Sequence, residues 1–258
     1  MRKIFNLLED VYSVSGATEI QEAIDTIGSG AGTIFIEAGT HQIIETINLN
    51  TGGSLIIYGH GGKTILKPST DINTFNITNM DSVTIEKLNI DASNMVTNVK
   101  GIIDVNEIGD NRVIIQNIKI FGDSDTKGVG VYAKSSFIEI KGCIFEYLHA
   151  GVYSEGENDL IITNNHCENM GNSGIQILNP TTKSILSNNS CTSTGTFGIV
   201  ISGGQHNIVE GNIVESCQRG ILITGETSLY NIISNNQSIS CSQAGIRIQN
   251  GADRNIGL

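Results

Sequence analysis

The sequence has no tryptophan, only 2 prolines and few aromatic residues, which make up 5% of its 258 positions. No apolar run approaches the ~20 residues that a membrane-spanning helix needs, so we expect no membrane segment and no membrane partner. Basic residues are also scarce, with 15 lysines and arginines against 26 aspartates and glutamates and a formal net charge of −11. Such a surface repels phosphate backbones, which argues against nucleic acid as a partner.

A recognisable secretory signal is missing as well. The chain begins with Met1 to Lys3, and the apolar stretch at 4–8 is interrupted by Asn6. That stretch is too short for the core of a signal peptide. We therefore expect synthesis in the cytoplasm. Three locations stay open: the cytoplasm itself, the extracellular space or a virion surface reached by a route that these residues do not encode, or export with a leader that has been removed.

The number of cysteines is odd, which argues against a complete disulfide framework. The five cysteines lie at positions 143, 167, 191, 217 and 241, with successive differences of 24, 24, 26 and 24. These differences indicate a repeat period and not the close spacing of metal ligands. We interpret the cysteines as small buried residues in stacked repeats.

Two further features recur with nearly the same period. A glycine followed by alternating apolar residues occurs six times, 21 to 25 residues apart, at Gly130, Gly151, Gly174, Gly198, Gly220 and Gly245. An asparagine shortly after an apolar pair occurs four times, at Asn165, Asn189, Asn212 and Asn236. Leucine-rich repeats need a leucine frame that is absent here, and two-helix repeats run to roughly 33 residues or more.

The period therefore predicts an all-β protein, a right-handed parallel β-helix with three strands per rung and roughly nine or ten rungs from residue 33 onward. β-Branched residues are frequent, and this region has no 3.6-residue apolar pattern. On stacked rungs identical side chains lie ~4.8 Å apart, so the four recurring asparagines are expected to form a structural hydrogen-bonded ladder. The glycines are expected to supply backbone freedom at turns.

We expect two parts of the chain, an N-terminal segment with a capping helix (1–31) and a single solenoid domain (32–258). Thr18 and Gln21 have the spacing of a capping box, and Gly28 is a natural helix stop. The apolar face of the helix is expected to comprise Ile20, Ala23, Ile24 and Ile27. This helix would cover the first rung, which otherwise exposes apolar surface. The last rung has no such element, which leaves open truncation, a further domain, or covering by another subunit.

Several stretches resemble a known superfamily. Ile20-Gln-Glu-Ala-Ile-Asp25, residues 32–40 and Gly59-His-Gly-Gly-Lys-Thr-Ile-Leu66 resemble the opening of pectate-lyase-like proteins. Residues 150–250 resemble the repeats of alginate C5-epimerase modules. The resemblance spans nearly the whole chain. It implies the right-handed parallel β-helix fold, on which lyases, hydrolases, epimerases, phage tailspikes and non-catalytic proteins are all built.

The catalytic motifs of that superfamily are not matched. The counterpart of the epimerase motif Tyr-Gly-(Phe/Val)-Asp-Pro-His-Glu is the stretch 151–157, in which only a glutamate is in register. Gly59-His60-Gly61 has the letters of a polygalacturonase motif, but no aspartate pair accompanies it. The clustered calcium ligands and arginine base of pectate lyases also have no counterpart. We expect no cofactor and no metal site: calcium is compatible with the superfamily, but no ligand cluster is identified.

The candidate site lies on the outer face of the Gly-led strands, where strand alternation directs every second side chain outward. The residues expected to bind a substrate there are Tyr132, Lys134, Tyr153, Glu155 and Gln176. Aromatic faces pack against sugar rings, and carboxylate, amide and ammonium groups give directed polar contacts. In an enzyme, Tyr153, His149 and Lys134 would be the candidates for proton transfer and for neutralising a substrate carboxylate. The alternative interpretation is an ordinary solvated sheet face.

Two functions follow. The first is a carbohydrate-binding or carbohydrate-active protein (a polysaccharide lyase, epimerase or glycoside hydrolase) with a polysaccharide as its partner. The second is a non-catalytic structural module, such as a viral tailspike or a surface adhesion protein. Val200 and Leu222 make the outer face apolar beyond Gln176, which suits subunit packing. A homo-oligomer is compatible with this, and a trimer is expected if the protein is tailspike-like.

Overall fold

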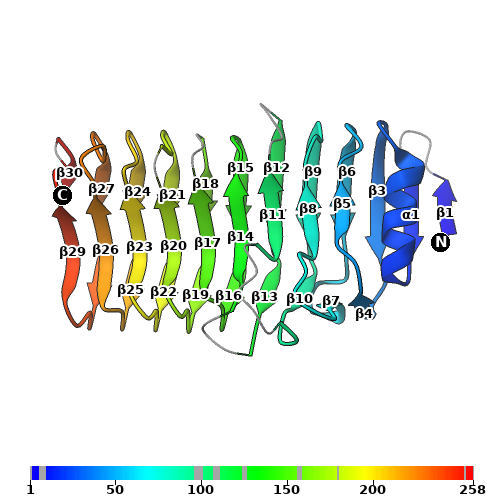
Figure 1. Cartoon of the computed structure of the whole chain (residues 1–258), viewed down its shortest axis with the longest axis horizontal. Helices are drawn as coiled ribbons and strands as arrows, with labels where there is room; N and C mark the ends of the chain where they lie inside the picture. The colour runs from blue at the N-terminus through cyan, green and yellow to red at the C-terminus, as the bar shows by residue number, and fades with distance from the viewer. Residues whose placement is uncertain are drawn as a thin grey trace.

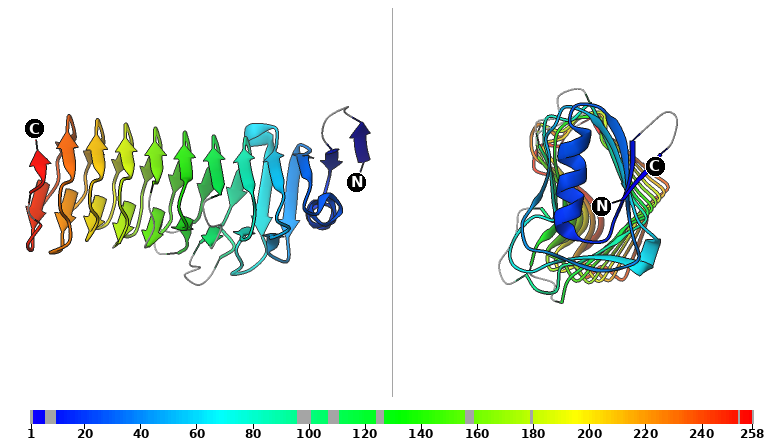
Figure 2. Two further views of the ribbon diagram at one scale, coloured as in Figure 1. Left: turned by 90° about the horizontal axis from the view of Figure 1, so that it is seen from above. Right: turned by 90° about the vertical axis from the view of Figure 1, so that its right-hand side faces the viewer.

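The computed structural model of the protein describes residues 2–5, 10–95, 101–106, 111–123, 127–155, 159–178, 180–252 and 254–257. Gly156 and Glu157, at the end of the epimerase-motif comparison, lie outside these residues. The chain winds as a solenoid whose rungs stack along one axis (Figures 1 and 2). Successive rungs pair in parallel, and in the described part of the chain only β1 and β2 pair antiparallel.

Three parallel sheets make up the walls of the solenoid. Sheet A comprises β1 (Arg2–Phe5), β2 (Asp10–Val14), β3 (Ala31–Ile36), β6 (Ser54–Tyr58), β9 (Ser82–Glu86), β12 (Arg112–Gln116), β15 (Ile138–Lys141), β18 (Ile161–Thr163), β21 (Ile185–Ser187), β24 (Ile208–Glu210), β27 (Ile232–Ser234) and β30 (Ile256–Gly257). Sheet B comprises β4 (Gly39–Ile43), β7 (Thr64–Pro68), β10 (Asn89–Asp91), β13 (Lys119–Phe121), β16 (Ile144–Glu146), β19 (His166–Glu168), β22 (Ser190–Thr192), β25 (Ile213–Glu215) and β28 (Gln237–Ile239). Sheet C comprises β5 (Ile47–Leu49), β8 (Phe75–Ile77), β11 (Ile103–Asn106), β14 (Val129–Lys134), β17 (Ala150–Glu155), β20 (Ser173–Leu178), β23 (Phe197–Ser202), β26 (Arg219–Thr224) and β29 (Ala244–Gln249).

Sheets B and C have 9 strands each, so the solenoid has about nine turns. This confirms the predicted class of fold, with three strands per rung. Alternation within each strand sends aliphatic side chains inward: in β9, Val83 and Ile85 are buried, whereas Thr84 between them is half-buried. Each such aliphatic side chain contributes roughly 1.5–3 kcal/mol on burial. The core is therefore one continuous column along the axis.

The N-terminal end is covered by α1 (Ala17–Ile27), which lies across the opening of the solenoid (Figure 2). The four predicted apolar residues of this helix are all buried. The predicted capping box is wrong: Gly16 is the N-cap, and no side chain caps the helix there. Instead, the Glu19 carboxylate accepts hydrogen bonds from the backbone N–H and hydroxyl of Ser15. Gly28 ends the helix at φ 58°, as predicted.

The six glycines near the start of the later strands of sheet C leave room for side chains of sheet B. None of the six has a positive φ, so the expected backbone freedom is not their role. A Cβ on Gly151 would lie 2.7 Å from the Sγ of Cys167, and one on Gly174 would collide with Cys191. These cysteines point inward from sheet B, where they pair in register on β19 and β22. Each glycine therefore makes room for a side chain from the opposite wall.

The recurring asparagines form hydrogen bonds from rung to rung. The Nδ2 of Asn165 donates to the Oδ1 of Asn189 at 3.0 Å, and Asn189 donates in the same way to Asn212 at 3.0 Å. Asn212 donates to Asn236 at 2.9 Å. Each of these Nδ2 groups also donates to a main-chain carbonyl of a preceding rung, such as Ile162 O at 2.8 Å from Asn189.

A second column of asparagines lies at the corner between sheets C and A. The Nδ2 of Asn207 donates to the Oδ1 of Asn231 at 3.0 Å, and Asn231 donates to Asn255 at 2.9 Å. Sequence reasoning missed this column, although its spacing of 24 residues is visible in the sequence. Two of the three corners of the later rungs are therefore held by amide columns.

Candidate functional site

The register of sheet C brings the predicted residues together on its outer face. Tyr132 pairs with Tyr153 on the next strand, and Tyr153 pairs with Gln176 on the strand after that. Asp104 pairs with Tyr132 on the other side, and Asn106 pairs with Lys134. We use the term outer strip for the following set: Asp104, Asn106, Tyr132, Lys134, Tyr153, Glu155 and Gln176.

Tyr132 is the buried centre of the outer strip. Its side chain is only 1% exposed, although it lies on the outer face. The Tyr153 ring stacks on it with centroids 5.6 Å apart and an interplanar angle of 20°. Val129 and Ala150 pack beside it, and its hydroxyl donates to the Oε2 of Glu155. Tyr132 therefore supports Tyr153 and Glu155 from below, and the expectation that it offers an open face to a sugar is wrong.

Tyr153 is the aromatic side chain that a ligand can reach. It is half-buried, because one face of its ring rests on Tyr132. Burial raises the pKa of the Tyr153 phenol, and the charge of Glu155 raises it further. The pKa of Tyr132 is raised more strongly, first by burial and then by its hydrogen bond to Glu155. Both phenols are therefore protonated at neutral pH, so neither is suited to act as a base.

Asp104 is a site residue that sequence reasoning missed. Its Oδ1 accepts a hydrogen bond of 2.7 Å from Asn106 Nδ2, and its Oδ2 accepts one of 3.2 Å from Asn73 Nδ2. Polar residues continue at the same register position on the two preceding strands, β8 and β5, where Asn76 Nδ2 donates to Asn48 Oδ1 at 3.1 Å. The repeat of a glycine followed by alternating apolar residues begins only at Gly130. Because β11 precedes it, the repeat could not be used to assign Asp104 to the outer face.

Gln176 is held in one orientation by its neighbours. Its Oε1 accepts hydrogen bonds from Ser173 Oγ at 3.0 Å and from Asn172 Nδ2 at 3.4 Å. In the described part of the chain, no acceptor contacts Gln176 Nε2, which leaves this group as a donor for a ligand. Lys134 and Glu155 are both exposed. No ion pair between them is found among the described residues, since Glu155 accepts from Tyr132 instead.

His149 lies in the turn before β17, and its main chain joins neighbouring rungs. Its N–H donates to Gly128 O at 2.9 Å, and its carbonyl accepts from Asn172 N at 2.9 Å. Its side chain is half-buried. No hydrogen bond or ring contact joins its imidazole to the outer strip among the described residues.

Beyond Gln176 the outer column becomes apolar but not exposed. Val200 and Leu222 continue the column of Tyr153 and Gln176, and they are only 4% and 3% exposed. The expected apolar contact surface at these two residues is therefore absent. Exposed isoleucines lie on all three sheets, and among them Ile161, Ile185 and Ile232 lie on the outer face of sheet A.

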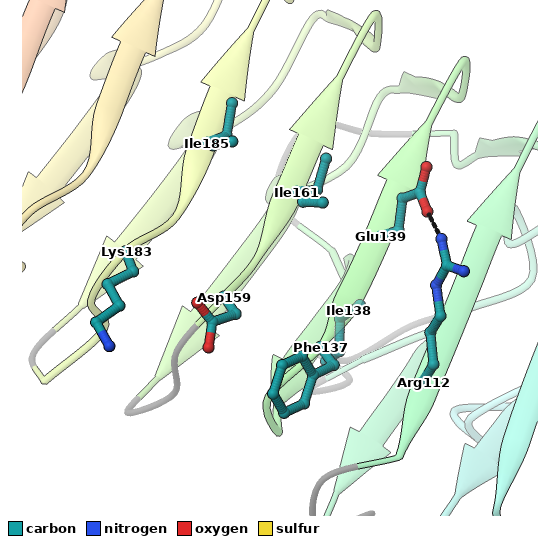
Figure 3. Close-up of a pocket in the computed structure, with 8 residues that line it drawn as sticks. All are labelled: Arg112, Phe137, Ile138, Glu139, Asp159, Ile161, Lys183 and Ile185. Atoms are coloured by element: carbon teal, nitrogen blue, oxygen red, sulfur yellow. Dashed lines mark hydrogen bonds and ion pairs between the residues drawn. The ribbon is translucent and has the colours of Figure 1, made fainter.

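A hollow of about 440 Å³ lies on that outer face of sheet A (Figure 3). Ile161 and Ile185 form its floor and are each 38% exposed. Its rim carries Phe137 and four charged residues, namely Arg112, Glu139, Asp159 and Lys183.

The charge of Glu139 at this hollow is already compensated. Glu139 forms ion pairs with Lys141 at 2.7 Å and with Arg112 at 2.5 Å, and both hold its pKa below the usual range. The hollow therefore has an aliphatic floor, and the carboxylate of Glu139 at its rim is already paired.

Two of the remaining histidines, His41 and His60, contact other parts of the protein. His41 is buried and lies within hydrogen-bond distance of two backbone carbonyls, while His60 packs edge-on against Phe35 at 4.8 Å. Among the described residues, no group of three or more His, Cys, Asp or Glu side chains is placed to hold a metal ion. Within the same residues, no helix is both long and apolar enough to span a membrane.

The fold agrees with a family of known proteins. Residues 101–257 match the family model of the right-handed β-helix region, which is more than half of the chain, and the protein belongs to this family. No curated protein sequence matches the chain.

Several solved structures share the fold. One is the catalytic domain of a GH87 α-1,3-glucanase variant in complex with nigerose (TM-score 0.69, 16% identity, 97% of this chain and 59% of that one). Another is the catalytic unit of a thermostable GH87 α-1,3-glucanase from Streptomyces thermodiastaticus strain HF3-3 (TM-score 0.72, 16% identity, 86% of this chain and 43% of that one). A third is an alginate lyase from Paenibacillus sp. str. FPU-7 (TM-score 0.66, 14% identity, 96% of this chain and 97% of that one). The chain thus spans less than two thirds of the glucanase chains but nearly all of the lyase.

Proposed function

We propose that the protein binds a polysaccharide along the outer strip of sheet C, with Tyr153 as the residue that packs against a sugar ring. The observation that carries this proposal is the stacking of half-exposed Tyr153 on buried Tyr132. The stacking fixes the ring in place before a ligand arrives, so little conformational entropy is lost on binding. Sugar C–H groups then pack against the exposed part of the ring.

The polar groups of neighbouring rungs supply the directed contacts. Lys134 and the Nε2 of Gln176 donate hydrogen bonds, whereas the carboxylates of Asp104 and Glu155 accept them. Rungs lie ~4.8 Å apart, and a linear polysaccharide advances by about 5 Å per sugar, so adjacent rungs can contact adjacent sugars. The similarity in fold to an α-1,3-glucanase bound to nigerose and to an alginate lyase supports a carbohydrate ligand.

The outer strip has several groups that can bind a sugar but few that can transfer a proton. Because burial and the charge of Glu155 raise the pKa of Tyr153, its phenol stays protonated and is not available to abstract a proton. A base would have to come from His149 or from a carboxylate of the strip. We therefore propose glycan binding as the function, and a lyase, epimerase or hydrolase activity only as its extension.

A glycan array with the purified chain tests the proposal, followed by absorbance at 235 nm for unsaturated uronates and by a reducing-sugar assay. Tyr153→Ala should weaken glycan binding at least tenfold, which corresponds to about 1.4 kcal/mol. Phe137→Ala, at the hollow on sheet A, is the matched control and should leave binding unchanged. Loss of binding in the control, and not in Tyr153→Ala, would move the site to sheet A. Absence of binding by the wild type to every glycan would favour the structural module.

A further inference from the structure

A row of isoleucines runs along the outer face of sheet A, away from the outer strip. Ile161, Ile185, Ile208 and Ile232 occupy the same register position on four successive strands, and all except Ile208 are exposed. Phe137, which is also exposed, lies in the turn beside the start of this row (Figure 3). A continuous apolar row at the surface is typical of a contact with another molecule.

Two further columns flank the isoleucines. The first is formed by the turn residue of each rung, two positions before the isoleucine position, where the backbone has a positive φ: Phe137, Asp159, Lys183 and His206. The second is formed by the last residue of each strand: Lys141, Thr163, Ser187 and Glu210. Each column is complementary to its own reverse. In the first, the order is ring, acid, base, ring, and in the second it is base, hydroxyl, hydroxyl, acid.

We propose that two copies of the chain associate face to face through sheet A, with their solenoid axes antiparallel. A two-fold axis parallel to the strands, midway between the rungs of Ile161 and Ile185, places each column over the reverse of itself. Asp159 then faces Lys183 of the second copy, and the ring of Phe137 faces His206 of the second copy. Because a two-fold contact is isologous, each of these pairs forms twice.

The centre of the contact is apolar. Ile161 lies over Ile185 of the second copy, so the hollow of about 440 Å³ above these residues receives isoleucines in place of water. Burial of this surface supplies the attraction, whereas the flanking charges fix the register. Lys141 faces Glu210 of the second copy but also pairs with Glu139 of its own chain at 2.7 Å, so it contributes less than Asp159 and Lys183 do.

Other placements of the axis lose this match. An axis through the rung of Asp159, or through that of Lys183, places the residue over its own counterpart and brings like charges together. An axis along the solenoid does the same to Glu139. In the described part of the chain, neither Asp159 nor Lys183 forms an ion pair within its own chain, so both charges can meet a second copy.

The size of the contact predicts a weak dimer. The strands from β12 to β27 give a footprint of about 29 Å by about 17 Å, at ~4.8 Å per rung and ~3.3 Å per residue. The resulting area of about 500 Å² per copy is below the roughly 800 Å² of a standard interface. We therefore expect a reversible dimer with a micromolar dissociation constant, which leaves the outer strip on sheet C of each copy open.

Sedimentation velocity of the full chain over a series of concentrations tests the dimer. The wild type should show a reversible monomer–dimer equilibrium. Asp159→Lys and Lys183→Asp should each raise the dissociation constant at least tenfold, because each variant brings like charges together at both pairs. An equimolar mixture of the two variants should dimerise as the wild type does, because one chain then presents two cations to two anions of the other.

Lys63→Asp, in the 3-10 helix η1 (Gly61–Lys63), makes the same change in charge as Lys183→Asp away from the contact and should leave the dissociation constant unchanged. Thermal melts confirm that each variant is folded. A wild type that is monomeric at every concentration, or that forms a trimer, would overturn the proposal. The same conclusion would follow from a mixture that dimerises no better than its two components.

Small-angle X-ray scattering of the wild type gives a check that needs no variant. It should show two solenoids side by side, and an end-to-end dimer would also overturn the proposal. Since the interface lies on sheet A, the affinity of each chain for a glycan, measured by calorimetry, does not depend on it. Failure of the dimer therefore leaves the proposed function standing.

Discussion

Tyr132 and Glu155 are joined across two adjacent strands of sheet C by a hydrogen bond from a buried phenol to an exposed carboxylate. Through this bond, a residue buried in the wall of the solenoid holds a residue that a ligand would contact. The ring of Tyr132 supports Tyr153, and its hydroxyl orients Glu155. Substitutions at Tyr132 are therefore expected to affect both stability and binding.

Tyr132→Ala should lower the free energy of unfolding by about 3 kcal/mol, because it removes a fully buried aromatic side chain and leaves a cavity. Tyr153→Ala should cost clearly less, since Tyr153 is half-buried. Urea unfolding followed by circular dichroism measures both values. Equal losses for the two variants would contradict the burial of Tyr132.

Tyr132→Phe separates the ring from the hydroxyl. The ring stays in place, so the loss of stability should be limited to about 1.5–3 kcal/mol, the range for a hydrogen bond to a charged group. If the hydroxyl orients Glu155 for a ligand, glycan affinity should fall in Tyr132→Phe at a temperature at which thermal melts show the variant to be folded. Unchanged affinity would mean that the position of Glu155 does not depend on this bond.

The stability of the protein should decrease in alkaline solution, in part through Tyr132. Its pKa is raised in the folded state above the value of about 10 for an unperturbed tyrosine. The unfolded chain therefore releases this proton first, so the contribution of Tyr132 is complete below pH 10 and is lost as the pH rises above it. The fall in unfolding free energy between pH 9 and pH 11 should be smaller in Tyr132→Phe than in the wild type. Parallel curves would show that Tyr132 does not contribute.

The asparagine column should be most sensitive at its buried middle. Asn189 is 1% exposed and has asparagine neighbours on both sides. Asn189→Leu leaves buried partners unpaired, at roughly 1–3 kcal/mol for each. Asn236 is only half-buried, so Asn236→Leu should lower the melting temperature less. Equal shifts in the two variants would argue against a cooperative column.

The cysteines should differ in their reaction with a thiol reagent. Cys143, Cys167, Cys191 and Cys217 are buried, and burial raises the pKa of Cys143 to about 12. Few thiolates form at pH 8 in such surroundings. Cys241 is partly exposed and should be the first to react in the native protein. Fast labelling of all five would contradict the stacked, buried arrangement.

Most of the fold could be predicted because the signals are local and repeated. The spacing of Gly151, Gly174 and their equivalents set the rung length, and alternation then assigned the core. The physical role of these glycines could not be read in the same way, since it depends on Cys167 and Cys191 in the opposite wall. The sequence of one strand does not show which side chain of another sheet will contact it.

The candidate site was predicted only in outline, for a similar reason. Alternation correctly directs Tyr132 outward, but its burial depends on what packs beside it, including Val129, Ala150 and Tyr153. Asp104 was missed because β11 precedes the Gly-led repeat and pairs with β14 over a longer rung, with Ile103 opposite Val131. The predicted start of α1 was two residues too late: the N-cap is Gly16 and not Thr18, and Glu19 accepts hydrogen bonds from Ser15.

The matching of each inward glycine to a side chain of sheet B has a consequence for how such a protein diverges. Gly151 with Cys167 and Gly174 with Cys191 are constrained as pairs, since enlarging the first member requires a smaller second. The outward positions of the same strands face no opposite wall, and there Tyr153, Gln176 and Val200 differ from rung to rung. Duplication of a single rung therefore copies a self-consistent interior together with an outer surface that is free to change. The outward residues of a single rung can therefore change and alter ligand binding, while the packing of the interior is kept as rungs are added.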